Sequence, residues 1–201
     1  NDLIIIIAAD CTGHGVPGAF MSMLGVSLLN EIVNKHEVTK ANLILNELRE
    51  EVKRTLRQTG REGEAKDGMD ISLCLLDRKK MQMQYARAYN PLYLFRDGKL
   101  YQYKADRMPI GIYIKEKPTF SNQLIDLKKG DTFYIFSDGY PDQFGGENGR
   151  KFKTRQLKDL LADIQDKSMD EQYRIVEETF NKWKGDHEQI DDVLLMGVRI
   201  G

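Results

Sequence analysis

The chain begins with an apolar run, LIIIIAA at residues 3–9, that is rich in β-branched residues and lacks polar alternation. Such a run favours a β-strand, and the missing alternation predicts a central strand that is covered on both faces. Asp10 follows immediately, and after it come a glycine-rich turn and a predicted helix that begins near Pro17. A carboxylate is costly to bury at the end of such a strand unless a positive group lies beside it. The sequence therefore raises the question of what that positive group is.

The 201 residues are enough for one substantial domain, and 41% of them are hydrophobic and 30% charged. Thirty basic residues balance 31 acidic ones, a net charge of −1, so we expect no nucleic-acid partner and no obligatory membrane surface. The two cysteines, Cys11 and Cys74, argue against a disulfide framework and predict a cytoplasmic location, although the parent protein could be tethered to a membrane. We expect neither thiol to be a nucleophile, because neither has an arginine at the spacing of a thiolate phosphatase loop.

Four helices are expected, at residues 17–33, 39–56, 155–165 and 169–184. The first is apolar nearly all round and should be deeply buried. The second should be an amphipathic surface helix capped by Thr39, and the last should be capped by Ser168 or Asp170.

Short alternating runs predict several strands after the second helix, and Asp97-Gly98 is a strong signal for a hairpin turn. These strands are expected in DISLCLLD (70–77), MQMQYARAY (81–89), PLYLFRDG (91–98), KLYQYK (99–104), NQLIDLKKGDTFYIFSDG (122–139) and DVLLMGVRI (192–200). The order of helices and strands predicts an α+β fold, with two mainly antiparallel sheets flanked by helices.

Acidic residues stand at the margins of three apolar strands: Asp10 after the first, Asp138 before a glycine, and Asp191 with Asp192 before the last. Each alone could simply cap a turn. If the strand ends share one edge, however, the carboxylates would repel one another unless a cation holds them. Oxygen donors suit Mg²⁺ or Mn²⁺ rather than Zn²⁺, and two such ions would support a phosphoester hydrolase.

Six blocks of the sequence, in order along the chain, resemble the SpoIIE/RsbU-type serine phosphatases, the bacterial branch of the metal-dependent (PPM, type 2C) protein phosphatases. The blocks are DCTGHGVPGAFMSM (10–23), DGMDISLCLLD (67–77), YNPLYLFRDGKL (89–100), MPIGIY (108–113), GDTFYIFSDGYPDQFGG (130–146) and QIDDVLLMGVRI (189–200). The resemblance implies an αββα sandwich with two Mg²⁺ or Mn²⁺ ions at one end of its sheets.

The resemblance also implies a ligand set. Asp10 would bridge both ions, the backbone carbonyl of Cys11 would be a further ligand, and Asp138 and Asp191 would complete the set. Asp142 would orient the water that the ions activate.

Three further residues have less settled roles. Asp70 or Asp67 would approach a third, weaker metal position. His14 is either a general acid that protonates the leaving oxygen or a turn residue that bonds the backbone of the glycine loop.

Family members carry another metal-binding aspartate in a Gly-Asp-Phe/Tyr block on the preceding strand, and this sequence starts after that block. We therefore expect residues 1–201 to be a single SpoIIE-type domain that lacks its first strand, the C-terminal output domain of a longer regulator. The incomplete ligand set predicts weak or no activity for this polypeptide alone.

The resemblance implies direct attack of metal-activated water on phosphoserine or phosphothreonine of a bacterial signalling protein, such as an anti-sigma-factor antagonist. An upstream sensor domain in the parent chain would control this activity, and the sequence does not decide between a monomer and a homodimer. The alternative is a catalytically impaired module that binds a signalling partner without turnover, although such a module has no need of all three strand-end aspartates.

Overall fold

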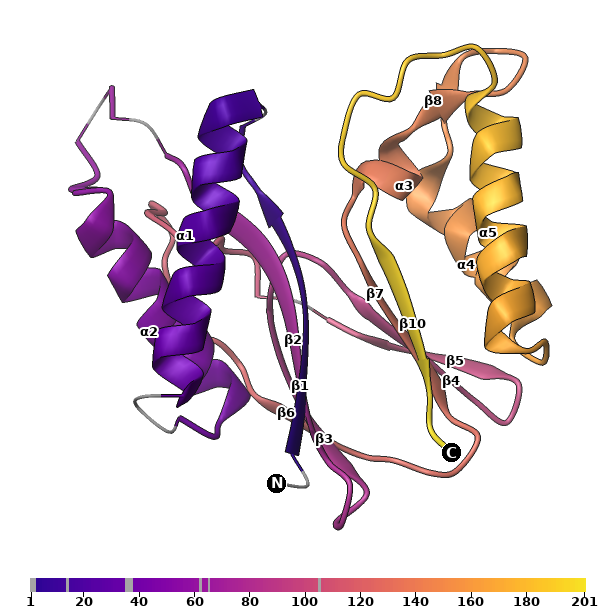
Figure 1. Ribbon diagram of the computed structural model, residues 1–201, viewed down its shortest axis with the longest axis horizontal. Helices are drawn as coiled ribbons and strands as arrows, with labels where there is room; N and C mark the ends of the chain where they lie inside the picture. Colours follow the sequence, from indigo (N-terminus) through magenta and orange to yellow (C-terminus); the bar gives the residue numbers. More distant parts are fainter. Residues whose placement is uncertain (1–2, 14, 35–37, 62, 65, 105) are drawn as a thin grey trace. The chain divides into compact units, whose positions relative to one another are not determined.

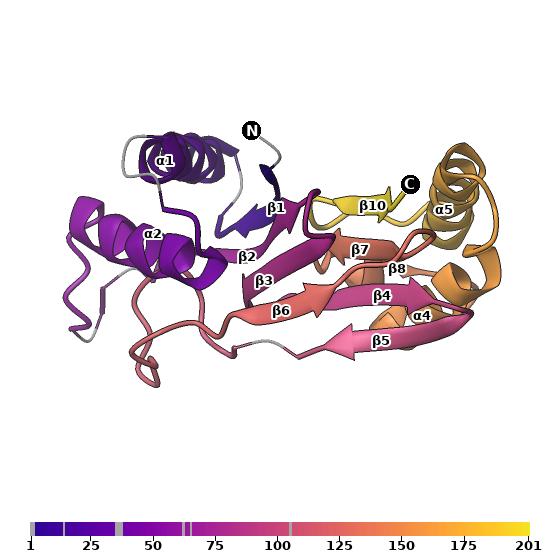
Figure 2. The ribbon, with the colours of Figure 1, turned by 90° about the horizontal axis from the view of Figure 1, so that it is seen from below.

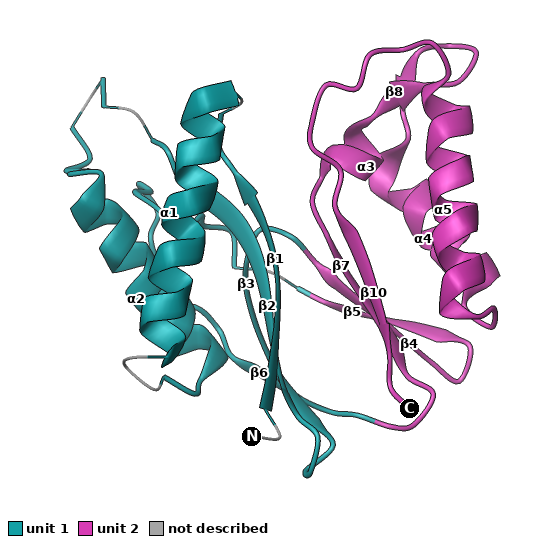
Figure 3. Ribbon diagram, viewed as in Figure 1, with its two compact units in different colours: residues 1–90, 104–127 teal, residues 91–103, 128–201 magenta. Residues whose placement is uncertain are grey.

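The computed structural model describes residues 3–13, 15–34, 38–61, 63–64, 66–104 and 106–201. The chain divides into two compact units, which are coloured separately in Figure 3. The first unit comprises residues 1–90 and 104–127, and the second comprises residues 91–103 and 128–201. Each unit contains one four-stranded sheet with its own helices (Figure 1).

The first unit is an antiparallel sheet in the order β1-β2-β3-β6, with two helices on one face (Figures 1 and 2). Its elements are β1 (Leu3–Cys11), α1 (Gly15–Asn34), α2 (Ala41–Thr55), β2 (Met69–Asp77), β3 (Gln82–Ala88) and β6 (Gln123–Asp126). The amphipathic pattern of α2 places Ile44, Leu48 and Val52 in an aliphatic core against the sheet, as predicted.

The position of β1 differs from the prediction. Within the described residues β1 pairs on one side only, with β2, so it is an edge strand of this sheet rather than a central one. Only Ala8 is fully buried, and Leu3 and Ile4 are each 42% exposed. The uniform apolar run identified a strand, but it did not specify how many neighbours that strand has.

The prediction that α1 is deeply buried was also wrong. The residues that pack are Gly18, Met21, Gly25, Leu28 and Ile32, a single face with helical spacing. The opposite face leaves large apolar side chains in solvent: Val16, Phe20, Met23 and Val26. By length and composition alone α1 could also cross a membrane, a test that core helices of soluble proteins pass as well.

The start of α2 is stabilised from outside the helix. Its N-cap residue is Lys40, which makes no side-chain cap, so the predicted cap at Thr39 is wrong. The Ala41 N–H instead donates to Oε1 of Gln84 on β3 at 3.2 Å, and Nε2 of Gln84 donates to the Thr39 carbonyl at 3.2 Å. A side chain from the sheet therefore accepts the hydrogen bond from the Ala41 N–H that a local N-cap side chain would otherwise have accepted.

The second unit is an antiparallel sheet in the order β10-β7-β4-β5, with α4 and α5 on one face (Figure 1). Its elements are β4 (Leu92–Arg96), β5 (Lys99–Tyr103), β7 (Thr132–Phe136), α3 (Gly139–Asp142), β8 (Phe144–Gly145), β9 (Arg150–Lys151), α4 (Lys153–Ile164), α5 (Met169–Lys184) and β10 (Leu195–Arg199). The small antiparallel hairpin of β8 and β9 was not predicted.

Two local predictions in this unit are confirmed. Asp97 and Gly98 have φ values of 50° and 73° and join β4 to β5 in a tight turn. Ser168 caps α5 in a reciprocal capping box with Glu171. The expected α+β class, with two antiparallel sheets flanked by helices, is confirmed as well.

Candidate metal centre

Asp10 of the first unit is the last but one residue of β1, where the strand leads into the turn. The antiparallel register pairs Asp10 with Asp70 of β2, and both carboxylates are half-buried. Like charges directly opposite one another destabilise a sheet. A cation at this edge would remove that repulsion, so the pair fits a metal site better than a purely structural role.

The turn after Asp10 brings a further acid to the same edge. The Thr12 N–H donates to the Gly68 carbonyl at 3.0 Å, and the Gly68 N–H donates back to Oγ1 of Thr12 at 3.0 Å. The Thr12 hydroxyl in turn donates to Oδ1 of Asp67 at 3.4 Å. Asp67 and Asp70, the two residues predicted for a third metal position, therefore both lie at the end of β1 near Asp10.

Two glycines let the chain turn sharply there, as predicted. Gly13 and Gly15 have φ values of 88° and 63°, in the region that side chains rarely adopt. A Cβ at Gly18 would lie 2.6 Å from the Gly13 carbonyl oxygen, so the first turn of α1 packs directly on the loop. His14, the predicted general acid or turn residue, lies outside the described residues.

Cys11 has the environment of an inert thiol. Burial raises its pKa, a hydrogen bond with Ser22 lowers it, and the charge of Asp10 raises it, with a net rise. Burial likewise raises the pKa of the Cys74 thiol. These directions agree with the expectation that neither cysteine is a nucleophile, and they leave the Cys11 carbonyl as its predicted contribution to the site.

In the second unit Asp138 and Asp191 come together. A carboxylate oxygen of each lies within 4.8 Å of one from the other, although the two residues are more than fifty positions apart. Both side chains are exposed. The pair offers oxygen atoms, the donors that Mg²⁺ and Mn²⁺ prefer, and two carboxylates at this separation repel each other without a cation. The donor set therefore fits a hard divalent ion.

Hydrogen bonds from Ser137 to the segment 192–194 hold Asp138 and Asp191 close together, and we call this set of contacts the polar clamp. Oγ of Ser137 donates to the Asp192 carbonyl at 3.0 Å and accepts from the Leu194 N–H at 3.0 Å. A Cβ at Gly139 would lie 2.3 Å from the Asp192 carbonyl oxygen, so only glycine allows the two segments to lie this close. The segment that carries Asp191 is thus held directly against the loop that carries Asp138.

Asp142 lies at the end of α3, and its N–H donates to the Asp138 carbonyl at 2.9 Å. Its carboxylate forms an ion pair with Nζ of Lys151 at 2.7 Å. The hydrogen bond with Asp142 and the charges of Asp142 and Asp138 raise the pKa of Lys151. Sequence reasoning missed Lys151, because a lysine in the stretch GRKFK after several glycines is equally typical of a solvated turn.

The structure thus groups the predicted residues in two sets. Asp10, Cys11, Asp67 and Asp70 lie together in the first unit, and Asp138, Asp142 and Asp191 lie together in the second. That these residues hold the same ions stays a prediction.

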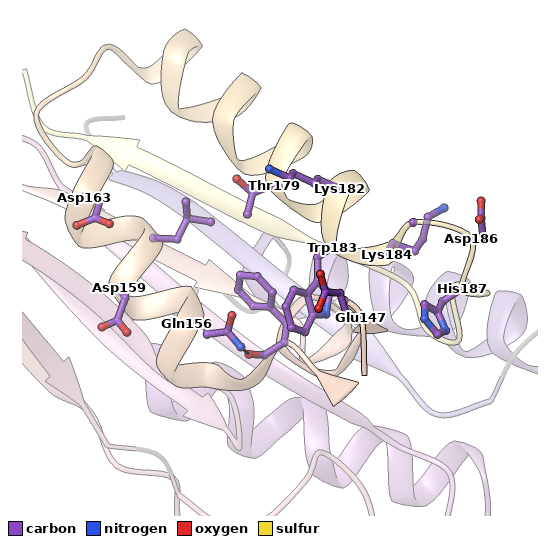
Figure 4. Close-up of a pocket in the computed structure, with 14 residues that line it drawn as sticks. Glu147, Gln156, Asp159, Asp163, Thr179, Lys182, Trp183, Lys184, Asp186 and His187 are labelled. Atoms are coloured by element: carbon purple, nitrogen blue, oxygen red, sulfur yellow. Dashed lines mark hydrogen bonds between the residues drawn. The ribbon is translucent and has the colours of Figure 1, made fainter. Parts of the chain in front are cut away.

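The second unit also has a cavity of about 870 Å³ beside the β8–β9 hairpin (Figure 4). Its described lining residues come from α4, the C-terminal part of α5, the following loop and the hairpin, and not from the carboxylate set. Trp183 in its wall donates its indole N–H to the Gln143 carbonyl at 3.1 Å. The cavity therefore adjoins the hairpin that carries Lys151.

Comparison with known families gives one clear match. The family model described as Stage II sporulation protein E (SpoIIE) matches residues 1–201, the whole chain. No curated protein sequence gives a significant match.

Several solved phosphatase structures share the fold. The SiaA-PP2C domain of Pseudomonas aeruginosa is 31% identical, with a TM-score of 0.87, and the match covers 100% of this chain and 77% of that one. The PP2C phosphatase domain of SpoIIE from Bacillus subtilis was solved with a fragment of its regulatory domain. It is 17% identical, with a TM-score of 0.74, and the match covers 98% of this chain and 55% of that one. The RsbU and RsbW domains of Rv1364c from Mycobacterium tuberculosis are 22% identical, with a TM-score of 0.72, and the match covers 98% of this chain and 52% of that one. This chain thus spans about half the length of the last two.

Proposed function

Because this chain belongs to the family of stage II sporulation protein E (SpoIIE) and has the fold of a PP2C-type phosphatase domain, we propose that it is the catalytic domain of a metal-dependent protein serine/threonine phosphatase. The observation that carries the proposal is the pair of Asp138 and Asp191, whose carboxylate oxygens lie within 4.8 Å of each other. Two exposed acids held at this separation by a polar clamp are arranged for a divalent cation.

The proposed ligands of Mg²⁺ or Mn²⁺ are Asp10, the Cys11 carbonyl, Asp138 and Asp191, with two ions bound. When bound, the ions would supply an activated water and neutralise charge on the phosphoryl group. Asp142 would accept a hydrogen bond from that water and so fix its direction of approach.

Three residues have proposed roles further from this set. Asp70 or Asp67 would bind a third, weaker ion at the end of β1. His14 keeps its two interpretations, a general acid or a turn residue, and a bell-shaped pH profile lost in His14→Asn would favour the first.

The proposed substrate is a phosphoserine or phosphothreonine on a bacterial signalling protein, such as an anti-sigma-factor antagonist. Support comes from the neighbours: one joins an RsbU domain to an RsbW domain, and another was solved with part of a regulatory domain. A sensor domain that acts on this one in the parent protein is proposed on the same grounds. The alternative, an impaired module that only binds a partner, is not favoured by the retained Asp138–Asp191 pair.

The test is hydrolysis of p-nitrophenyl phosphate and of a phosphoserine peptide by the full parent protein, measured with and without Mn²⁺. Activity should require the metal and should fall by about 100-fold or more in Asp138→Asn, because a ligand is lost while the fold remains. Asp186→Asn, an exposed acid in the loop after α5, is the matched control and should change little. Metal-independent activity, or equal activity in Asp138→Asn, would contradict the proposal.

A further inference from the structure

Lys151 is held beside the candidate metal ligands by a small hairpin. It lies on β9, where it pairs with Phe144 of β8, and its Nζ lies 5.8 Å from the centre of the Phe144 ring. The same Nζ is 2.7 Å from Oδ2 of Asp142. The side chains of Lys151 and Asp142 are 45% and 41% exposed, so both can reach a ligand from solvent.

The hairpin itself is firmly anchored. A Cβ at Gly145 would lie 1.9 Å from the Trp183 carbonyl oxygen, and the Gly146 N–H donates to that oxygen at 2.8 Å. The Gln143 carbonyl accepts from the Trp183 indole at 3.1 Å and from the Phe152 N–H at 3.0 Å. Trp183 lies beside the hairpin at the end of α5 (Figure 4). Lys151 is therefore presented from a rigid support rather than from a free surface loop.

The ion pair with Asp142 does not by itself explain this arrangement. A half-exposed lysine–aspartate pair contributes little to stability, because water screens the charges and the side chains lose rotamer freedom. An ammonium has three N–H donors, and the carboxylate of Asp142 uses one of them. The other two N–H donors can therefore bind an anion that approaches these acidic residues together with a divalent metal ion.

The nearby charges favour such an anion. The charge of Asp138 contributes to the raised pKa of Lys151, so the ammonium lies within electrostatic reach of a proposed metal ligand. A phosphate monoester is a dianion near neutral pH, and its oxygens form strong charge-assisted hydrogen bonds with ammonium groups.

We propose that Lys151 binds the phosphoryl group of the substrate, with Asp142 holding its ammonium in position. This inference rests on the proposed function and names the side chain of this unit that recognises the phosphate monoester. It predicts that the same contact holds inorganic phosphate, the product of hydrolysis.

The test measures binding of inorganic phosphate to the Mn²⁺-loaded protein by titration calorimetry, independently of turnover. Lys151→Met keeps the length of the side chain and removes its charge, and it should weaken phosphate binding by about 10-fold or more. Lys151→Arg should restore most of the binding. Arg150→Met is the matched control, because Arg150 precedes Lys151 on the same strand and points to the opposite face, and it should bind phosphate like the wild type.

The same variants separate this inference from the proposed function. With a phosphoserine peptide, Lys151→Met should raise KM, while Mn²⁺ affinity and the thermal unfolding temperature stay at their wild-type values. Equal phosphate binding in wild type and Lys151→Met, including no binding in either, would overturn the inference. Phosphate binding that depends on Lys151 in a full parent protein without turnover would support the inference and would contradict the proposed function instead.

Discussion

The two units bury different kinds of core beneath similar sheets. In the first unit the helices pack on aliphatic side chains, with Ile44, Leu45 and Leu48 of α2 fully buried. In the second unit the corresponding core is mainly aromatic. Its aromatic members are Tyr93, Phe95, Tyr134, Phe136, Tyr140, Phe152, Phe180 and Trp183.

This difference determines how each unit fixes its acidic residues. Buried tyrosines need partners, and Tyr134 donates to Oε1 of Gln172 at 2.5 Å while Tyr140 donates to the Val176 carbonyl at 2.8 Å. These directional bonds tie α5 to β7 and α3, the elements around Asp138. In the first unit Asp10 is positioned by the strand register, by the hydrogen bonds between Thr12 and Gly68, and by aliphatic packing. Aliphatic packing is not directional, so this core can adjust more easily.

The largest expected effect follows from the clamp in the second unit. In Gly139→Ala the new Cβ would lie 2.3 Å from a backbone oxygen, that of Asp192, which cannot move without displacing Asp191. We expect a loss of more than about 3 kcal/mol in unfolding free energy, together with weakened Mn²⁺ binding. Urea unfolding and metal titration measure the two effects. Wild-type stability and metal affinity would show that the clamp is not rigid.

A similar loss of stability is expected in the first unit, but without a specific effect on the site. Leu48→Ala leaves a cavity in the aliphatic core and should cost about 3 kcal/mol. Below its midpoint of unfolding the variant should still bind Mn²⁺ normally. Leu124→Ala, at a position 64% exposed in the same unit, should change stability by less than about 0.5 kcal/mol. Loss of Mn²⁺ binding in folded Leu48→Ala would contradict the claim that the aliphatic core affects stability without a specific effect on the site.

A smaller effect tests the directional bonds. Tyr140→Phe removes the donor to the Val176 carbonyl and should cost about 1 kcal/mol, the net contribution of one such hydrogen bond to stability. Tyr173→Phe, on the exposed side of α5, removes a hydrogen bond to Glu177 that water can replace, so its stability should be unchanged. Equal stability of the two variants in urea would argue against a structural role for the buried hydroxyl.

The smallest effect is expected at a glycine of the first unit. A Cβ at Gly25 would lie 3.0 Å from the methyl end of Met69, a flexible side chain that can shift. Because alanine also favours the helix by about 1 kcal/mol, Gly25→Ala should change stability by less than about 1 kcal/mol in either direction. A thermal unfolding curve that falls as far as that of Gly139→Ala would mean that the first unit is equally rigid.

Local patterns in the sequence predicted the strands well and pointed to the candidate acids. Alternation and the Asp97-Gly98 turn marked β4 and β5, and a carboxylate at the margin of an apolar strand marked Asp10, Asp138 and Asp191. Such signals depend on neighbours in the sequence, which any reading of one chain can use.

What the sequence did not reveal depends on contacts between distant segments. Apolar residues all round α1 could not show that only one face of the helix is covered. Gln84 replaces Thr39 at the start of α2 because β3 happens to lie there. Lys151 gains its partner through a hairpin of two-residue strands, which has no periodicity to recognise.

The central claim, that acids from distant parts of the chain hold the same divalent ions, is tested most directly by Mn²⁺ titration followed by electron paramagnetic resonance. Asp10→Asn and Asp138→Asn should each weaken Mn²⁺ binding by about 100-fold, since each removes a proposed ligand, while circular dichroism shows both proteins folded. Wild-type Mn²⁺ affinity in either folded variant would contradict the claim.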